Sequence, residues 1–520
     1  MQFFKPGYFL IMNSPIPVTA IFDIGKTNKK FLLFNRKSEA VYQRKVRLDE
    51  TVDDDGYPCE DLQQMVAWMK ESFREAVLNR SFRIAGLNIA AYGATLVHLD
   101  ENGEVAAPLY NYLKPFPEEL QQQFYHTYGG RKPFSLQTAS PPLGMLNSGL
   151  QLYWLKHGKP DMFRKIATTL HLPQFLVYLF SGRLSSELTS IGCHTAMWDF
   201  AQGGYHRWIQ DEEMMGMFPE IEPVSTVVPI EYDGLRLDAG IGIHDSSAAL
   251  APYLYAMEEP FILLSTGTWN IAMNPFTDEP LTYEELEKDG LLYLNIYGKP
   301  VKASRLFLGS KYSRQVRKLG SFFGRNRNEM DCSPDPAIFR KILAENHPER
   351  KLKTEKTRSD GPETLKKPEL RDVSVFNTYE EACHQLMLDL VVSQLESLNL
   401  VMDKVGDRSG GHMAADAGGH MADDKHNHIL VKNSHYQTRE KVRPGQIIIT
   451  GGFSKNVFYT RLLASFLPHT KIHTATTSNA SALGASLVLS ETSKERAGLQ
   501  SLLGLERHEP FENLNLERYR

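Results

Sequence analysis

Residues 18–34 read VTAIFDIGKTNKKFLLF, and this stretch points to the fold. Two apolar runs, VTAIF and FLLF, flank a polar turn that contains Gly25, which predicts two strands joined as a hairpin. The same pattern returns at residues 261–273, FILLSTGTWNIAM. Two hairpins of one kind, one near the start of the chain and one near its middle, predict two related α/β domains.

The spacing of apolar residues elsewhere also favours an α/β fold, because helix-like and strand-like segments alternate. Residues 61–78 and 146–157 are helix-like, and residues 383–402 carry an apolar face at helical spacing. Residues 446–450, QIIIT, predict a buried strand. The small residues at 480–486 predict a helix that another backbone can approach closely.

The length of 520 residues is too great for one packed domain and fits two large ones. A hydrophobic content of 42% with 23% charged residues is ordinary for a soluble globular protein. We expect an N-terminal extension at residues 1–17, a first domain at 18–250, a second domain at 251–490 and a C-terminal tail at 491–520.

Charge and cysteine usage exclude several classes of protein. The formal net charge of −4 leaves no basic footprint for nucleic acid or an anionic membrane. Four scattered cysteines without a CxxC pair fit a reducing compartment better than a disulfide framework. No segment approaches the roughly 20 apolar residues of a membrane span, and residues 1–17 make a poor signal peptide. We therefore expect a cytoplasmic protein.

A polar segment at residues 406–446 is rich in Gly, His and Asp and contains the imperfect duplicate GGHMAADA and GGHMADDK. It has no sustained apolar period, which predicts a solvated loop inside the second domain. Its histidines (His412, His420, His426 and His428) suggest a metal site as the alternative. We favour the loop, because the segment has no cysteine and no rigid scaffold. Residues 349–367 predict a second exposed excursion.

Asp23 is the first candidate for chemistry. A carboxylate at a strand end, beside a Gly/Thr/Asn turn, offers an anchor for Mg²⁺ next to groups that bind phosphate oxygens. Gly25-Lys26-Thr27 imitates a P-loop, but Ala20 stands where the first glycine of that motif is needed, and a strand rather than a helix follows. An ordinary hairpin turn is the alternative interpretation.

Two further glycine turns follow in the chain. Thr266-Gly267-Thr268 closes the second hairpin, and Gly451-Gly452 lies between a strand and a helix with Ser454 as candidate N-cap. Glycines at such turns let backbone amides approach a ligand closely. Their order after the acidic hairpin predicts a nucleotide held between two duplicated domains.

Asp245 lies in GIHDSSAA, residues 242–249, directly before a stretch of small residues that predicts a helix start. One interpretation is a helix N-cap. The other is a general base, because a carboxylate at the mouth of a cleft can orient a sugar hydroxyl and accept its proton during phosphoryl transfer.

Taken together, these motifs resemble those of the FGGY family of carbohydrate kinases. DIGKTNKK is similar to the opening phosphate motif of the family, D-x-G-[ST]-[ST]-x-x-[KR], and GIHDSSAA to its G-x-H-D-x-x-A segment. STGTWN is similar to the second phosphate hairpin, ITGGFSKN to the late glycine motif, and residues 181–200 to a stretch of the sugar domain. The order and spacing match from residue 18 to about residue 489.

The resemblance implies two ribonuclease-H-like domains of the actin/hexokinase type, with a nucleotide cleft between them. It implies ATP and Mg²⁺ as cofactors and a small sugar as substrate, and it leaves a homodimer open. The implied sites are listed by role: Asp23 for Mg²⁺; Gly25, Thr27, Lys30, Thr266, Gly267, Thr268, Gly451, Gly452 and Asn456 for ATP and its phosphates; Tyr92, Gly93, His244 and Asp245 for the sugar, with Asp245 as catalytic base.

Three departures from the family pattern concern the sugar and the phosphate. Lys26 stands where the family usually has a small hydroxyl residue. Tyr92-Gly93 replaces Gln-Gly or Trp-Gly, and residues 110–114 lack an Asp that many relatives use on sugar hydroxyls. The His-Asp pair and residues 297–302 lean toward the rhamnulose/fuculose branch, and xylulose is a further candidate. The competing function is a non-catalytic nucleotide switch or sugar sensor on the same fold, resembling actin or the heat-shock chaperone ATPases.

Overall fold

The computed structural model describes residues 14–277, 279–345, 347–352, 371–402, 444–477, 479–490, 496–514 and 516. Most of the predicted N-terminal extension, and the Gly/His-rich segment up to residue 443 with its four histidines, lie outside the described residues. Of the second polar excursion, only residues 349–352 are described.

The first half of the chain builds a seven-stranded sheet in the order β13-β14-β6-β1-β2-β3, with β15 beside β6. β1 and β2 form the predicted hairpin, and β1 pairs with β6 in parallel. The strands are β1 (Ile16–Ile24), β2 (Lys29–Asn35), β3 (Ala40–Val46), β6 (Phe82–Ala91), β13 (Val228–Tyr232), β14 (Leu235–Ala239) and β15 (Ile243–His244).

The second half repeats this arrangement in the order β18-β19-β17-β16-β20-β21-β22. The predicted hairpin β16–β17 is antiparallel, and β16, β20 and β21 are parallel neighbours. The strands are β16 (Phe261–Thr266), β17 (Asn270–Asn274), β18 (Gly290–Leu294), β19 (Pro300–Leu306), β20 (Gln446–Gly451), β21 (Lys471–Ala475) and β22 (Leu505–His508). Each sheet thus has three antiparallel neighbours, β1-β2-β3 or β16-β17-β19. Two strands parallel to the first of these follow, and then an antiparallel edge strand, which makes the second sheet a structural duplication of the first.

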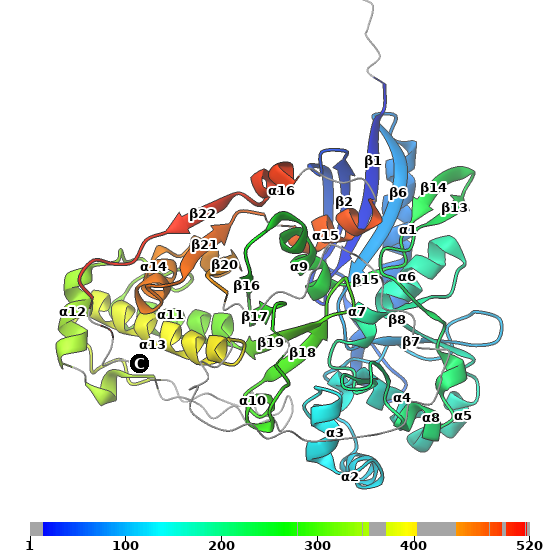
Figure 1. Ribbon diagram of the computed structural model, residues 1–520, viewed down its shortest axis with the longest axis horizontal. Coiled ribbons are helices and arrows are strands. Elements are labelled where there is room, and N and C mark those ends of the chain that lie inside the picture. The colour runs from blue at the N-terminus through cyan, green and yellow to red at the C-terminus, as the bar shows by residue number, and fades with distance from the viewer. Residues whose placement is uncertain are drawn as a thin grey trace, which may run out of the picture.

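Helices cover both sheets and fill the space between them (Figure 1). α1 and α6 pack on the outer face of the first sheet, and α11, α12, α13 and α14 form a core with the outer face of the second. α9, α15 and α16 contribute to the core shared by the inner faces. The helices are α1 (Leu62–Leu78), α6 (Leu172–Ser181), α9 (Asp245–Ala256), α11 (Leu308–Phe323), α12 (Pro336–Glu345), α13 (Tyr379–Asn399), α14 (Val457–Phe466), α15 (Ala480–Leu489) and α16 (Arg496–Leu503).

α15 joins the two halves, although it lies near the end of the chain. Figure 1 shows it beside β1 and β6 of the first sheet. Buried Asn88 of β6 donates a hydrogen bond to the Ala485 carbonyl at 3.0 Å. A Cβ added at Gly484 would overlap the backbone carbonyl of Ala248 in α9, so the close approach predicted for this small-residue helix is confirmed.

An insertion between β6 and β13 forms the lower right part of the molecule in Figure 1. Aromatic residues around Phe124, Tyr153 and Trp208 make a core of their own there. Its elements are β7 (Leu96–Leu99), α2 (Glu118–Thr127), α3 (Arg131–Gln137), α4 (Ser148–Gly158), α5 (Pro160–Phe163), β8 (Thr168–His171), β9 (Ser186–Glu187), α7 (Leu188–Ile191), β10 (Trp198–Asp199), β11 (Gly204–Tyr205), α8 (Trp208–Asp211) and β12 (Ile221–Glu222). The remaining short elements are β4 (Glu50–Val52), β5 (Pro58–Glu60) and α10 (Tyr283–Leu286).

Residues 491–520 are not simply the tail that the sequence suggested. They contribute α16, which packs near α9, and β22, which pairs antiparallel with β21 as the edge strand of the second sheet. The strand was missed because its four residues, LERH, alternate apolar and charged residues only once.

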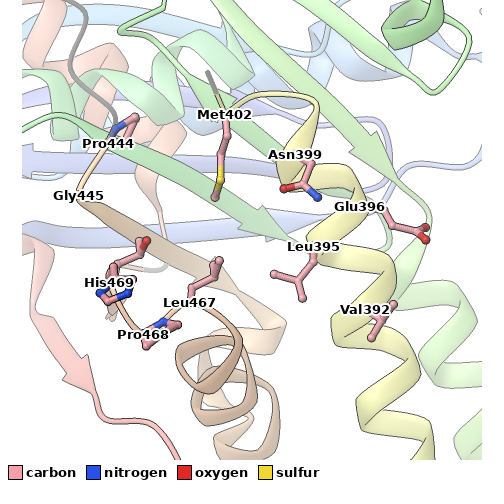
Figure 2. A pocket seen from close by; sticks show the side chains of 11 residues that line it. Val392, Leu395, Glu396, Asn399, Met402, Pro444, Gly445, Leu467, Pro468 and His469 are labelled. Atoms are coloured by element: carbon pink, nitrogen blue, oxygen red, sulfur yellow. The ribbon is translucent and has the colours of Figure 1, made fainter. Parts of the chain in front are cut away.

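Figure 2 shows a hollow in the second half of the chain, beside α13. Its volume is about 460 Å³, and its lining comes from α13 and from the segment before β21. Met402 and Pro444, which border the segment 403–443, both line it. Among the described residues, no helix is both long and apolar enough to cross a bilayer.

Candidate active site

The turn of the first hairpin places Asp23 and Lys30 opposite each other at the end of β1 and β2. Gly25 N donates to the Asn28 carbonyl at 3.0 Å and closes the turn. Lys30 Nζ lies 3.1 Å from Asp23 Oδ2 and donates to Asn479 Oδ1 at 3.3 Å. Asn479 directly precedes α15, so the predicted phosphate turn of the first half touches an element of the second.

The other two predicted phosphate turns lie side by side, because Thr266 of β16 is the register partner of Gly451 in β20. Gly267 N donates to the Trp269 carbonyl at 3.0 Å, and Thr266 Oγ1 accepts a hydrogen bond from Phe453 N at 3.0 Å. Gly451 has a φ of 81°, and a Cβ there would overlap the Thr266 carbonyl. Glycine is therefore required for the two turns to approach each other.

The helix after Gly451-Gly452 is capped by a different residue from the predicted one. A 3-10 helix, Gly452–Lys455, intervenes before α14, so Ser454 cannot cap that helix and instead donates to the Gly451 carbonyl at 2.7 Å. Asn456 is the N-cap, and its Oδ1 accepts from Tyr459 N at 3.1 Å. The expected contact of Asn456 with the nucleotide stays a prediction.

Asp245 is the first residue of α9 and follows the short strand β15. The N-cap position is His244, whose side chain makes no capping hydrogen bond, so Asp245 itself is not the N-cap residue of the helix. Its carboxylate accepts a hydrogen bond from Ser246 Oγ at 3.2 Å and keeps 28% of its side-chain surface exposed.

The environment of Asp245 holds its proton unusually tightly. Burial, and after it the negative charge of Asp23, raises the pKa of the Asp245 carboxyl to about 7. The two acidic candidates, which are far apart in sequence, thus lie close enough to repel each other. A carboxyl with a pKa near neutrality is suited to general-base work at physiological pH.

His244 connects Asp245 to the other residues predicted to bind the sugar. Its Nε2 is 3.3 Å from Asp245 Oδ1 and 3.2 Å from Cys193 Sγ. Burial lowers the pKa of His244 to about 4, so the imidazole is neutral at physiological pH. A Cβ at position 93 would lie 3.0 Å from His244 Nε2, so glycine at this position leaves room for the imidazole.

Tyr92 belongs to the same wall, but its hydroxyl is already bonded. Tyr92 Oη donates to Glu60 Oε2 at 2.6 Å, and Glu60 also accepts from Lys29 Nζ at 2.7 Å. Lys26, the departure from the family pattern, lies over the rings of Tyr92 and Tyr112 at 5.8 and 5.5 Å. The hydroxyl proton of Tyr92 is therefore already used in the bond to Glu60.

Sequence inspection missed Tyr112, Cys193, Tyr293 and Arg305. Burial, and then the charges of Glu60 and Asp245, raises the pKa of Tyr112 to about 12. Tyr293 comes from β18 of the second sheet, and its ring centroid is 6.0 Å from that of His244. Tyr112 and Cys193 lie in stretches that the sequence comparison with the family already covered, whereas no local motif marks Tyr293 and Arg305, which only the packing of the two halves brings near His244 and Cys193.

Asp23 suits the role of a magnesium anchor. It is 8% exposed, and its ion-pair partner Lys30 lies 3.1 Å from Oδ2. The negative charge of Asp23 contributes to the raised pKa of Asp245. A divalent cation bound to Asp23 would neutralise this charge. A second acidic group, Asp53-Asp54-Asp55, fits a metal poorly, because Lys114 and Lys159 already pair with its carboxylates at 2.5–2.6 Å.

Comparison with known proteins places this geometry in context. Residues 18–228 match the model described as the FGGY family of carbohydrate kinases, N-terminal domain. A rhamnulokinase from Oceanobacillus iheyensis is 23% identical over 239 residues, which are 43% of this chain and 48% of that protein. An L-fuculokinase from Haemophilus influenzae is 22% identical over 285 residues, which are 49% of this chain and 57% of that protein. The chain thus spans about half the length of the curated relatives it matches.

Solved structures match nearly the whole chain. A carbohydrate kinase from Novosphingobium aromaticivorans aligns with a TM-score of 0.72 at 22% identity and covers 97% of both chains. A ligand-bound xylulose kinase from Lactobacillus acidophilus aligns with a TM-score of 0.70 at 13% identity, over 95% of this chain and 94% of that one. The predicted two-domain α/β fold of the actin/hexokinase type is confirmed. Residues 18–228 are thus similar to the N-terminal domain of the FGGY family of carbohydrate kinases, and the whole chain has the fold of the solved carbohydrate kinases.

Proposed function

We propose that the protein is an ATP-dependent carbohydrate kinase that transfers a phosphoryl group to a hydroxyl of a small sugar, with Asp245 as general base. The observation that carries this proposal is the carboxyl of Asp245, with a pKa near 7, set between Asp23 and the aromatic and histidine residues of the sugar side. A nucleotide switch has no need of a basic carboxylate in such a place.

In this proposal Asp245 orients the acceptor hydroxyl and takes its proton as the bond to phosphorus forms. The turns with Gly25, Thr27, Lys30, Thr266–Thr268 and Gly451-Gly452 hold the phosphates, and Asn456 lies toward the adenosine. Asp23 would hold Mg²⁺, which supplies charge neutralisation at the phosphates when bound. Tyr92, Gly93 and His244 form one wall of the sugar site.

The acceptor is proposed to be a ketose such as rhamnulose, fuculose or xylulose, in carbohydrate catabolism. Support comes from the names of the curated relatives, rhamnulokinase and L-fuculokinase, and from the His-Asp pair at residues 244 and 245. We further expect a cytoplasmic protein without nucleic-acid partners. A homodimer stays a prediction.

The test is to incubate the purified protein with ATP, Mg²⁺ and a panel of ketoses, polyols and sugar acids, and to measure ADP formation. We expect sugar-dependent turnover with at least one member of the panel. Tight nucleotide binding with no sugar-dependent turnover on any member would favour the competing function, a nucleotide switch or sugar sensor on the same fold.

A further inference from the structure

One face of β19 points at the first half of the molecule. Val301 and Ala303 of this strand belong to the apolar core shared with Cys193 and Ile243 of the first half. Side chains alternate along a strand, so Arg305 is the next residue on this face. Arg305 therefore stands where the shared core ends, at the same end of the sheet as the turn between β16 and β17.

The guanidinium of Arg305 is held in place without using up its hydrogen-bonding capacity. Nη2 is 2.9 Å from Asp289 Oδ1, and Cζ lies 5.8 Å from the ring centroid of Trp269. The side chain is 12% exposed. Nε is buried and has no hydrogen-bond partner among the described residues. Asp289 thus balances the charge of the guanidinium. Of the five N–H donors that an arginine carries, the Nε–H donor still lacks an acceptor.

The residues around Arg305 place it on the sugar side of the site. Its positive charge acts on the side chains of Cys193, His194 and Tyr293. Cys193 is the residue whose Sγ lies 3.2 Å from His244 Nε2. The Trp269 ring beside Arg305 belongs to the turn with the predicted phosphate-binding residues Thr266–Thr268. Arg305 thus lies between that turn and the residues next to Asp245.

A purely structural ion pair is the simpler explanation, and β19 offers a comparison. Lys302, on the opposite face of the strand, pairs with Glu285 at 3.1 Å, and both side chains are nearly inaccessible, at 2% and 7%. That pair faces the interior of the second half. The pair of Arg305 differs, because it lies where the two halves meet and leaves Nε without an acceptor.

Resting on the proposed kinase function, we propose that Arg305 is a ligand-binding residue that donates from its guanidinium to an anionic oxygen bound beside Tyr293. Two sources supply such an oxygen: the carboxylate of a sugar-acid acceptor, and the phosphoryl group in transfer. The planar guanidinium offers adjacent donors that suit either group.

Arg305→Lys separates this role from the structural one, because lysine keeps a positive charge for Asp289 but has no Nε–H donor at the guanidinium position. The matched control is Arg236→Lys, which alters an exposed arginine paired with Glu231 at 3.6 Å on the far strand β14. Both variants are assayed with D-gluconate and with D-xylulose as acceptors, and their melting temperatures are compared with that of the parent.

Loss of a hydrogen bond to a charged group predicts an effect of about 10-fold or more. A rise in KM for D-gluconate alone assigns the oxygen to the acceptor carboxylate. A fall in kcat with every accepted sugar, at nearly constant KM, assigns it to the phosphoryl group. Constants for Arg305→Lys that match those of Arg236→Lys overturn the proposal.

A binding measurement keeps this result distinct from failure of the kinase function. If the parent protein turns over no sugar, D-gluconate and inorganic phosphate are titrated into parent and variant by calorimetry. Binding to the parent that weakens about 10-fold or more in Arg305→Lys supports the assignment even then. Equal affinities, or no binding of either probe to the parent, show that Arg305 is only a structural residue.

Discussion

Replacement of Asp245 by asparagine should change the stability in a pH-dependent way. The free energy of unfolding of the variant, measured relative to that of the parent, should be higher at alkaline pH than at acidic pH. The pKa of Asp245 is raised from 3.8 to about 7 in the folded protein, so the folded state holds this proton more tightly than the unfolded state. The stabilisation that results is complete below about pH 4 and is lost as the pH rises through about 7. Asparagine has the same shape but no carboxyl proton, so the variant does not suffer this loss.

The magnitude follows from the two pKa values. The difference between 3.8 and about 7 corresponds to at most ~4 kcal/mol of unfolding free energy. Because 28% of the side chain faces solvent, water screens part of the effect, so this figure is an upper limit. About 60% of it, at most ~2.6 kcal/mol, falls between pH 5 and pH 8. For one of the two domains that corresponds to a relative rise in Tm of at most about 5–10 °C.

The assay is thermal unfolding of parent and Asp245→Asn at pH 5 and pH 8, in EDTA and without nucleotide, so that no metal alters the charge near Asp23. Asp238→Asn, which removes an exposed carboxylate of the same half, controls for the loss of one charge. A difference in Tm between Asp245→Asn and the parent that is the same at both pH values would refute the raised pKa and the proximity of Asp23 that contributes to it.

Three further substitutions test other parts of the account. Asp23→Asn should raise the Mg²⁺ concentration needed for half-maximal turnover by about 10-fold or more, as measured by Mg²⁺ titration at fixed ATP, and an unchanged requirement would place the metal elsewhere. Tyr92→Phe removes the donor to buried Glu60 and should lower the unfolding free energy by about 1 kcal/mol, measured by urea denaturation, whereas a neutral effect would mean that the bond adds nothing. Gly484→Ala introduces a Cβ that overlaps a backbone carbonyl of α9 and should lower the unfolding free energy by about 2–3 kcal/mol, measured by the same method. The control Gly204→Ala, whose Cβ meets no atom within 4 Å, should lower it far less, and equal losses would refute the tight contact between α9 and α15.

The local elements were predictable because their signals are local. The runs VTAIF and FLLF gave the hairpin β1–β2, and the apolar face at 383–402 gave most of α13. α1 ends at the predicted residue and is capped by Asp61, whose side chain accepts from Gln64 N. In each case the periodicity of a few adjacent residues is sufficient.

Contacts between the two halves were not predictable from periodicity. Asn88 of β6 bonds to the backbone of α15, almost four hundred residues later, and nothing in the strand sequence announces this partner. Tyr293 and Arg305 read as ordinary strand residues in β18 and β19. They become candidates for function only once the second sheet packs against Cys193 and His244. Gly93, by contrast, could be named from the sequence, because it lies at a position of the family pattern.

Turnover by Asp245→Asn is the decisive measurement for the role of this carboxylate. Parent and variant are assayed side by side for ADP formation with the best sugar of the panel, at saturating ATP and Mg²⁺, and the affinity for ATP is measured separately. As a general base, Asp245 predicts a fall in kcat of about 10²–10⁴-fold with ATP affinity retained and a Tm no lower than that of the parent. Turnover at the parent rate would contradict the account and place the base elsewhere.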